Sequence, residues 1–253
     1  MTFRLPRLMV APTGARRSKA DHPRLPVSIS EIVAAARDCF DAGAGALHAH
    51  IRNDDGSHSL DAGRYRELLQ EMMRAVPAMP VQITTESAGI YTPEQQREVL
   101  RQLSPIAASV SIREMLADGD LRAAGHCYRD AANAGTAIQH ILYDANDIRL
   151  LGHSIDTGTV SPDGLQALLV MGAYDTRRPA RLSELKQFLG QASELLPDAD
   201  IAICAFGPDE TVILREMLAL GGKVRVGFEN NLHSMDGTLA HDNAMRVAEI
   251  LGE

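Results

Sequence analysis

Short β-type runs alternate with longer helix-type runs from one end of this 253-residue sequence to the other. The helix-type runs have apolar residues at three- and four-residue spacing, as in Leu182, Leu185, Phe188 and Leu189. The repeat averages about thirty residues, which is the length of a βα unit. Such regular alternation is typical of parallel strands covered by helices, so it predicts an α/β architecture.

Eight β-type runs are expected to form strands. They span residues 8–11, 46–51, 80–85, 108–112, 137–143, 165–171, 201–206 and 224–228. Eight strands alternating with helices in a chain of this length predict a (β/α)8 TIM barrel, as one domain over residues 1–253. An open doubly wound sheet is the alternative. No G-x-G-x-x-G follows the first run, which disfavours its dinucleotide-binding form.

The segments between these runs carry helix start and stop signals. Ser28 and Glu31 have the spacing of a capping box, and Gly43 is placed to close that helix. Thr92 and Pro93 are typical of an N-cap followed by proline at the first helical position. The expected helices span residues 29–42, 62–75, a segment beginning at 93, 118–134, 146–156, 180–196, 209–220 and 240–251.

Composition and charge exclude several classes of protein. Hydrophobic residues make up 45% and charged residues 23% of the chain, which is an ordinary globular mixture. No apolar run reaches about 18 residues, and the N-terminal residues lack a signal-peptide pattern, so neither a membrane span nor secretion is expected. A net charge of −8 argues against a nucleic-acid partner. Cys39, Cys127 and Cys204 lie far apart without a CxxC pair, which predicts reduced thiols and a cytoplasmic location.

His48 and His50 form the most informative pair in the sequence. Side chains at i and i+2 of a strand share a face, and the turn signal at residues 52–56 puts this pair near a strand's carboxyl end. In a barrel that end carries the active site. Glu229 follows the eighth expected strand, and in a closed barrel the second and eighth strands both flank the first, so Glu229 can approach His48 and His50. Two histidines and a carboxylate predict an open, catalytic site for Zn²⁺ or another divalent metal. The alternative is a pair of structural histidines and a helix-capping glutamate.

Further candidates lie at the carboxyl ends of other expected strands. Small residues around Thr13 and Gly14 would let a ligand approach the backbone. Thr84 and Glu86 share a face, and the threonine can hydrogen-bond a carbonyl oxygen. Ser111 ends the fourth strand. We expect Thr13, Gly14, Thr84 and Ser111 to bind substrate.

Arginines near the same strand ends are candidates for binding a carboxylate. Arg113 follows the fourth strand, and Arg225 lies in the eighth, on the same face as Glu229 only if the backbone stays extended. We expect Arg113 to bind substrate, and a surface ion pair is its alternative role. The loop at residues 175–178 contains two adjacent arginines, which suit either a solvated turn or a phosphate-bearing cofactor.

Three motifs of this sequence resemble those of the β-keto acid cleavage enzymes, whose best-known activity is cleavage of 3-keto-5-aminohexanoate. The first is VAPTGA at residues 10–15 with KADHPRLPV at 19–27. The second is AGA at 42–44 with HAHIR at 48–52 and DG at 55–56, and the third is GGKVRVGFENN at 221–231. The motifs occur in the family's order, and the resemblance covers nearly the whole chain.

The resemblance implies a metal-dependent TIM barrel that joins a β-keto acid to acetyl-CoA and releases acetoacetate and a new acyl-CoA by a retro-Claisen step. It implies Zn²⁺ held by His48, His50 and Glu229. It also implies that Arg225 organises the acidic group and the developing charge. A β-keto acid and a CoA thioester are therefore the expected small-molecule partners, and a homo-oligomer, either dimer or tetramer, is expected.

The sequence departs from the family pattern in four places. Asn230 stands where the family has an aspartate that acts as the base, and an amide accepts no proton at neutral pH. SIRE at residues 111–114 replaces a small-residue pattern. Arg16 and Arg17 stand where amine-using relatives have an acidic residue, which favours neutral or acidic substrates over cationic ones. The chain also ends at Glu253, where relatives often continue.

The departure at Asn230 leaves both the base and the reaction type open. Glu86, Glu114 and Asp144 are candidate bases, and Glu86 is the first choice because it shares a face with Thr84. An ion pair with Arg113 is the alternative role of Glu86. A metal-dependent lyase of aldolase or decarboxylase type, working without CoA, is the second functional hypothesis. A non-catalytic metal- or metabolite-binding relative is the third.

Overall fold

The computed structural model describes residues 3–173 and 178–252. Its barrel strands are β1 (Leu8–Val10), β2 (Ala46–Ala49), β5 (Val81–Thr84), β6 (Ala107–Ser111), β7 (Ala137–Leu142), β8 (Gln166–Met171), β9 (Asp200–Ala205) and β10 (Lys223–Val226). They close in the order β1-β10-β9-β8-β7-β6-β5-β2, with parallel pairing throughout. This closure confirms the predicted (β/α)8 barrel and excludes the open doubly wound sheet.

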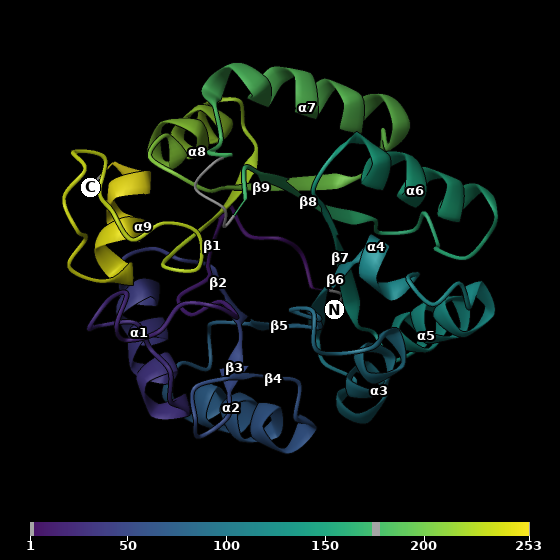
Figure 1. Cartoon of the computed structure of the whole chain (residues 1–253), viewed down its shortest axis with the longest axis horizontal. Coiled ribbons are helices and arrows are strands. Elements are labelled where there is room, and N and C mark those ends of the chain that lie inside the picture. The colour runs from purple at the N-terminus through teal and green to yellow at the C-terminus, as the bar shows by residue number, and fades with distance from the viewer. Residues whose placement is uncertain (1–2, 174–177, 253) are drawn as a thin grey trace.

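The helices form a ring outside the strands (Figure 1). They are α1 (Ile29–Asp41), α2 (Ala62–Ala75), α3 (Pro93–Leu103), α4 (Ile112–Met115), α5 (Leu121–Asn133), α6 (Ala145–Asp156), α7 (Leu182–Leu195), α8 (Glu210–Ala219) and α9 (Asn243–Leu251). The predicted caps are present, because Ser28 and Glu31 form the capping box of α1 and Thr92 caps α3. No helix in the described residues is both long and apolar enough to cross a membrane.

Most strand ends differ from their sequence-based expectation by one or two residues, and two of these differences shape the mouth. The strand expected over residues 46–51 stops at Ala49, and the chain then forms a hairpin of β3 (Ile51–Arg52) and β4 (His58–Ser59). Gly56, with φ of 82°, supplies the left-handed residue that this tight turn needs. The strand expected to reach residue 112 ends at Ser111, where α4 begins. In both places the chain leaves the barrel wall at its carboxyl end, and the segment that follows lies over the mouth.

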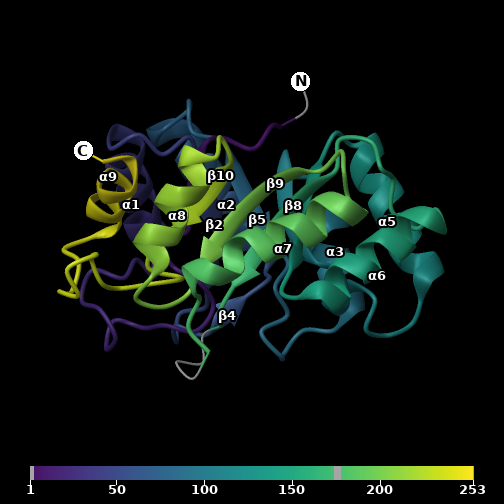
Figure 2. The same cartoon turned by 90° about the horizontal axis from the view of Figure 1, so that it is seen from above.

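Buried Arg52 fastens the hairpin to the loop that follows β1. Its guanidinium donates hydrogen bonds to the carbonyl oxygens of Gly14, at 2.6 and 2.9 Å, Arg17, at 2.9 Å, and Gly56, at 2.7 Å. Charge-assisted bonds of this kind hold two irregular segments in one arrangement. Figure 2 shows β4 at the end of the barrel opposite the N-terminus, which is the end where the parallel strands finish.

The inside of the barrel has two unlike halves. Most inward side chains of β2, β5 and β6 are polar and buried: His48, Gln82, Thr84, Ser109 and Ser111. Those of β8 and β9 are mostly apolar and pack with Ile141 of β7: Leu168, Val170, Ala202 and Cys204. The outward side chains of the same strands pack against the helices in a separate, larger core. Cys39, Cys127 and Cys204 are all buried and free.

Candidate active site

His48, His50 and Glu229 converge at the mouth of the barrel. Oε2 of Glu229 lies 3.5 Å from Nε2 of His48 and 3.4 Å from Nε2 of His50, and one ligand atom from each residue lies within 4.8 Å of the others. Two atoms bound to one ion at about 2.1 Å with tetrahedral angles would lie about 3.4 Å apart. The three side chains are therefore already spaced as ligands of one small divalent ion.

The hydrogen bonding of these ligand atoms also fits an ion. Among the described residues, neither ring nitrogen of His50 nor Oε2 of Glu229 has a hydrogen-bond partner, although all three atoms are buried. Burial lowers the pKa of both imidazoles well below the usual value, so both are neutral and can offer a lone pair. Buried polar atoms without partners are rare, and one bound ion would satisfy Nε2 of His50 and Oε2 of Glu229 together.

A glutamine chain across the barrel orients His48. Gln82 donates from Nε2 to Oε1 of Gln139 at 3.0 Å, so its own Oε1 faces Nδ1 of His48 at 2.8 Å. This assigns the proton of His48 to Nδ1 and leaves the lone pair of Nε2 available to an ion. Gln82 was not predicted, although its place two residues before Thr84 in a buried strand puts it on the same inward face.

A sharp turn after β10 brings Glu229 back over β1. Gly227 has φ of 145°, and a Cβ there would lie 2.3 Å from the carbonyl oxygen of Ala11, so only glycine fits. Across this turn, Nη2 of Arg225 donates to Oε1 of Glu229 at 2.9 Å. The two residues therefore meet through a turn and not through an extended strand. Arg225 holds one carboxylate oxygen while the other faces the histidines.

Glu86 lies beside the three converging groups. Its Oε2 is 3.7 Å from Nε2 of His50, and its side chain lines the cavity above them. Burial raises the pKa of Glu86 to about 7, and the negative charge of Glu229 acts in the same direction. Glu86 is thus placed next to the candidate ion site, as expected of a proton acceptor for a substrate held there.

His58 of the hairpin is a neighbour of the site that the sequence did not suggest. Its ring centroid lies 5.3 Å from that of His50, and its Nε2 lies 2.8 Å from the carbonyl oxygen of Glu86, which accepts the bond. His58 therefore fixes the backbone that carries Glu86. No local pattern predicted this contact, because it depends on the two-residue strand β4.

A cavity of about 100 Å³ opens beside the three converging side chains. Its polar wall is formed by His48, Thr84, Glu86, Arg225 and Glu229. Its opposite wall is formed by Ile141, Tyr143, Val170, Gly172, Ala173 and Phe206. The cavity is therefore closed on one side by groups suited to a keto acid head and on the other by mostly apolar surface.

Other predicted site residues are near the mouth without forming part of that wall. Thr13 and Ser111 are buried, and within the described ranges their hydroxyl oxygens have no hydrogen-bond partner. Arg113 extends outward to Asp144 and Asp147, each at 2.7 Å, and not to Glu86. The structure therefore does not bring Arg113 to the cavity. Of the predicted loop at 175–178, only the last residue lies within the described ranges.

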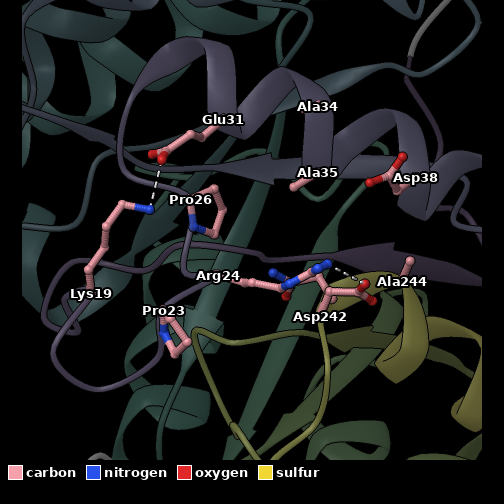
Figure 3. A pocket seen from close by; sticks show the side chains of 11 residues that line it. Lys19, Pro23, Arg24, Pro26, Glu31, Ala34, Ala35, Asp38, Asp242 and Ala244 are labelled. Atoms are coloured by element: carbon pink, nitrogen blue, oxygen red, sulfur yellow. Dashed lines mark hydrogen bonds and ion pairs between the residues drawn. The ribbon is translucent and has the colours of Figure 1, made fainter.

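A separate groove lies outside the barrel, between the first loop, α1 and the start of α9 (Figure 3). Lys19 faces Glu31 at 2.7 Å and Arg24 faces Asp242 at 3.5 Å across it. Its lining contains none of the residues that converge at the mouth. The groove is a surface feature, and the buried site is the stronger candidate for chemistry.

A closed parallel barrel with two histidines and a glutamate gathered at its strand ends defines a TIM-barrel protein with the geometry of a metal site. The chain matches the model of the beta-keto acid cleavage enzymes over residues 7–252. It therefore belongs to this family, as the three motifs predict. The chain is a transferase of the β-keto acid cleavage type.

Curated relatives cover nearly the whole chain. The 3-oxoadipate:acetyl-CoA acetyltransferase of Cupriavidus necator is 28% identical, over 96% of this chain and 86% of its own length. The 3-keto-5-aminohexanoate cleavage enzyme of Fusobacterium nucleatum is 23% identical, over 94% of this chain and 87% of its own. Both names describe enzymes that act on keto acids.

Solved structures support the fold. The apo structure of ObcA superimposes with a TM-score of 0.70 at 14% identity, over 91% of this chain, which spans 61% of that protein's length. A type I 3-dehydroquinate dehydratase from Clostridium difficile superimposes with a TM-score of 0.62 at 11% identity, over 99% of this chain and 93% of its own. At these identities the likeness concerns the barrel alone.

Proposed function

We propose that this protein cleaves a β-keto acid with acetyl-CoA as co-substrate, giving acetoacetate and a new acyl-CoA. We propose Zn²⁺, or another divalent ion, as its metal, held by His48, His50 and Glu229. The observation that carries the proposal is the 3.4–3.5 Å spacing of buried ligand atoms at the barrel mouth. Membership of the family supports the reaction type.

The surrounding side chains suit the reaction. A bound divalent ion would supply Lewis acidity to the keto oxygen of the substrate. Arg225 holds Glu229 in place and brings positive charge to the cavity wall, where developing negative charge needs it. Thr84 lines the same wall and can hydrogen-bond the substrate's head. Glu86 is proposed to accept the proton that Asn230 cannot accept, because its carboxylate lines the cavity.

The apolar wall supports a neutral tail on the β-keto acid. Ile141, Val170 and Phe206 offer no charged group to a terminal carboxylate or amine. The small cavity volume favours a short alkyl or branched tail. This proposal differs from the substrates named for the two relatives, since 3-oxoadipate carries a second carboxylate and 3-keto-5-aminohexanoate carries an amine.

The experiment that tests the function is an acetyl-CoA-dependent cleavage assay with metal-loaded protein and a panel of β-keto acids. Acetoacetate and acyl-CoA should appear together, and neutral short-tailed substrates should be cleaved fastest. Turnover of the same keto acids without acetyl-CoA would favour the lyase alternative. Metal binding without turnover of any panel member would favour a non-catalytic relative.

Cellular location and assembly are proposed from the sequence-based arguments. The three free, buried cysteines fit a reducing compartment, so we propose a cytoplasmic enzyme. The family resemblance supports a homo-oligomer, either dimer or tetramer. Light scattering of the purified protein measures the mass directly, and a monomer would contradict this proposal.

A further inference from the structure

A second cavity of about 400 Å³ lies beside the metal cavity. Its described lining consists of Arg17, Ala173, Pro179 and residues that follow β9 and β10, and it shares Ala173 and Phe206 with the metal cavity. The loops after the seventh and eighth strands of TIM barrels often bind phosphate-bearing ligands. A molecule in this second cavity would therefore reach the reacting centre past Phe206.

Two buried polar side chains on the wall of the second cavity are unsatisfied. Asn230 is 1% exposed, and in the described part of the chain neither its Oδ1 nor its Nδ2 has a hydrogen-bond partner. The same holds for Oγ of Ser234, whose residue is 6% exposed. Leaving such groups unpaired is costly, and native structures rarely do so without a ligand, ion or water. These atoms are suited to a ligand that enters the cavity.

The neighbouring residue Asn231 differs from Asn230, because the side-chain amide of Asn231 has hydrogen-bond partners. Asn231 donates from Nδ2 to the carbonyl oxygen of His233 and accepts from its backbone N–H, both at 3.0 Å. Arg17 donates to the carbonyl oxygens of Phe228, at 2.5 Å, and of Asn230, at 3.0 Å. The backbone around Asn230 is therefore fixed on both sides while its own amide is left unpaired. This combination is typical of a preorganised binding group.

The chemistry of the cavity matches a flexible chain that carries amides. An asparagine side chain both donates and accepts, so it can pair with both halves of a secondary amide. The apolar part of the wall, formed by Pro179, Phe206, Pro208, Leu232 and Met235, suits the methylene groups between amides. Acetyl-CoA carries its thioester at the end of such an arm, the pantetheine, which contains two secondary amides joined by short alkyl segments.

We infer that the second cavity binds the pantetheine arm of the thioester co-substrate, and that Asn230 hydrogen-bonds an amide of that arm. This inference rests on the proposed acetyl-CoA-dependent function. It gives a positive reason for the amide where the family pattern has an acid, because a carboxylate offers acceptors only. It also separates the roles at this strand end: Glu229 faces the metal cavity and Asn230 faces the co-substrate.

The test is a binding measurement on intact, metal-loaded protein. Calorimetry compares the affinities of CoA, pantetheine and adenosine 3′,5′-bisphosphate for the parent, Asn230→Ala, Ser234→Ala and a control. The control is Asn133→Ala, at the exposed end of α5. We expect Asn230→Ala to weaken CoA and pantetheine by the same factor, about tenfold, since a net hydrogen bond is worth several-fold in affinity. Ser234→Ala should weaken the binding of CoA and of pantetheine by a smaller factor. The affinity for the bisphosphate should be the same in all variants.

Kinetics of the same variants provide a second readout. Asn230→Ala should raise the KM for acetyl-CoA and leave the KM for the β-keto acid unchanged, with circular dichroism and metal content as in the parent. Parent-like pantetheine affinity in Asn230→Ala would overturn this inference while leaving the proposed function intact. Faster acetyl-CoA-dependent cleavage by Asn230→Asp, with unchanged pantetheine affinity, would also overturn it. Keto acid turnover that needs no acetyl-CoA would instead overturn the function.

Discussion

The two halves of the barrel interior differ in what their buried side chains require. On β2, β5 and β6 the inward residues are mostly polar, and His48 and Gln82 form one hydrogen-bonded chain with Gln139 of β7. On β8 and β9 the inward residues around Leu168 and Val170 only need close packing. The first half holds reactive groups in defined orientations, and the second half shapes the space beside them. The barrel therefore places its orienting polar side chains and its space-shaping apolar side chains on different strands.

The comparison extends to the buried polar atoms at the mouth, beside the polar half. Most buried polar groups there have partners, as buried polar groups usually do. The exceptions within the described chain include Nε2 of His50 and Oε2 of Glu229, which lie 3.4 Å apart just beyond the ends of these strands. Unsatisfied atoms that converge indicate a ligand, whereas the apolar half needs no such partner. The predictions below test this division.

The largest effect is expected from removing a proposed metal ligand beside the polar half. His48→Ala or His50→Ala should lose the divalent ion and lower kcat/KM by about a thousandfold or more. The reason is that a Lewis acid contributes several kcal/mol, and about 1.4 kcal/mol is a factor of ten. Plasma mass spectrometry and the cleavage assay measure the two losses. His126→Ala, on the exposed face of α5, is the control and should keep both metal and activity. Full metal content in both ligand variants would mean that these histidines are structural.

A smaller loss is expected from the carboxylate next to the ligands. Glu86→Gln keeps the shape and removes the proton acceptor, so kcat should fall about a hundredfold with metal retained, within the range of general-base contributions. Steady-state kinetics with saturating acetyl-CoA measure it. Glu114→Gln is the matched comparison, because Glu114 bonds the backbone N–H of Ser87 and does not line the cavity. Equal activities of the parent and Glu86→Gln would assign the proton to another group.

In the apolar half we expect selectivity to change and the metal to stay. Ile141→Val removes one methylene from the cavity wall, which should lower kcat/KM for the best short-tailed substrate about tenfold. For a substrate with one more methylene, kcat/KM should fall less or rise. The control is Ile138→Val, on the outward face of the same strand, which should not alter the preference. If Ile141→Val lowers kcat/KM equally for all substrates, the apolar wall does not contact the substrate's tail.

The smallest effect concerns a histidine without a role in the site. His140 of β7 faces outward toward Tyr128, with ring centroids 5.3 Å apart, and burial lowers its pKa to about 4. The unfolded chain binds a proton at about pH 6.5, so this group's contribution to stability is complete above that pH and is lost toward pH 4. Between pH 7.5 and 5.5 the parent should lose about 1.4 kcal/mol more free energy of unfolding than His140→Leu.

Urea denaturation of both proteins at the two pH values measures this difference. Because all other titrating groups are shared, their contributions cancel in the comparison. Equal losses in the parent and in His140→Leu would show that His140 is protonated in the folded protein.

Much of the site was predictable because it is encoded in local patterns. The alternation of runs specifies strands, helices and their direction, and parallel strands must end at one mouth. The i, i+2 spacing of His48 and His50 and the place of Glu229 after the last strand then suffice to bring them together. The same reasoning found Thr84 and Glu86. These predictions needed no knowledge of which residues face each other across strands.

Other features were decided only by the tertiary structure. The bond between Gln82 and Gln139 joins residues 57 positions apart, and the contact of His58 with His50 depends on a hairpin that no periodic pattern announced. Arg113 looked suited to a substrate carboxylate, yet Asp144 and Asp147 hold it outside the cavity. Sequence period determines which face a side chain occupies. Its partner depends on the register between strands and on loop paths, which only the closed barrel defines.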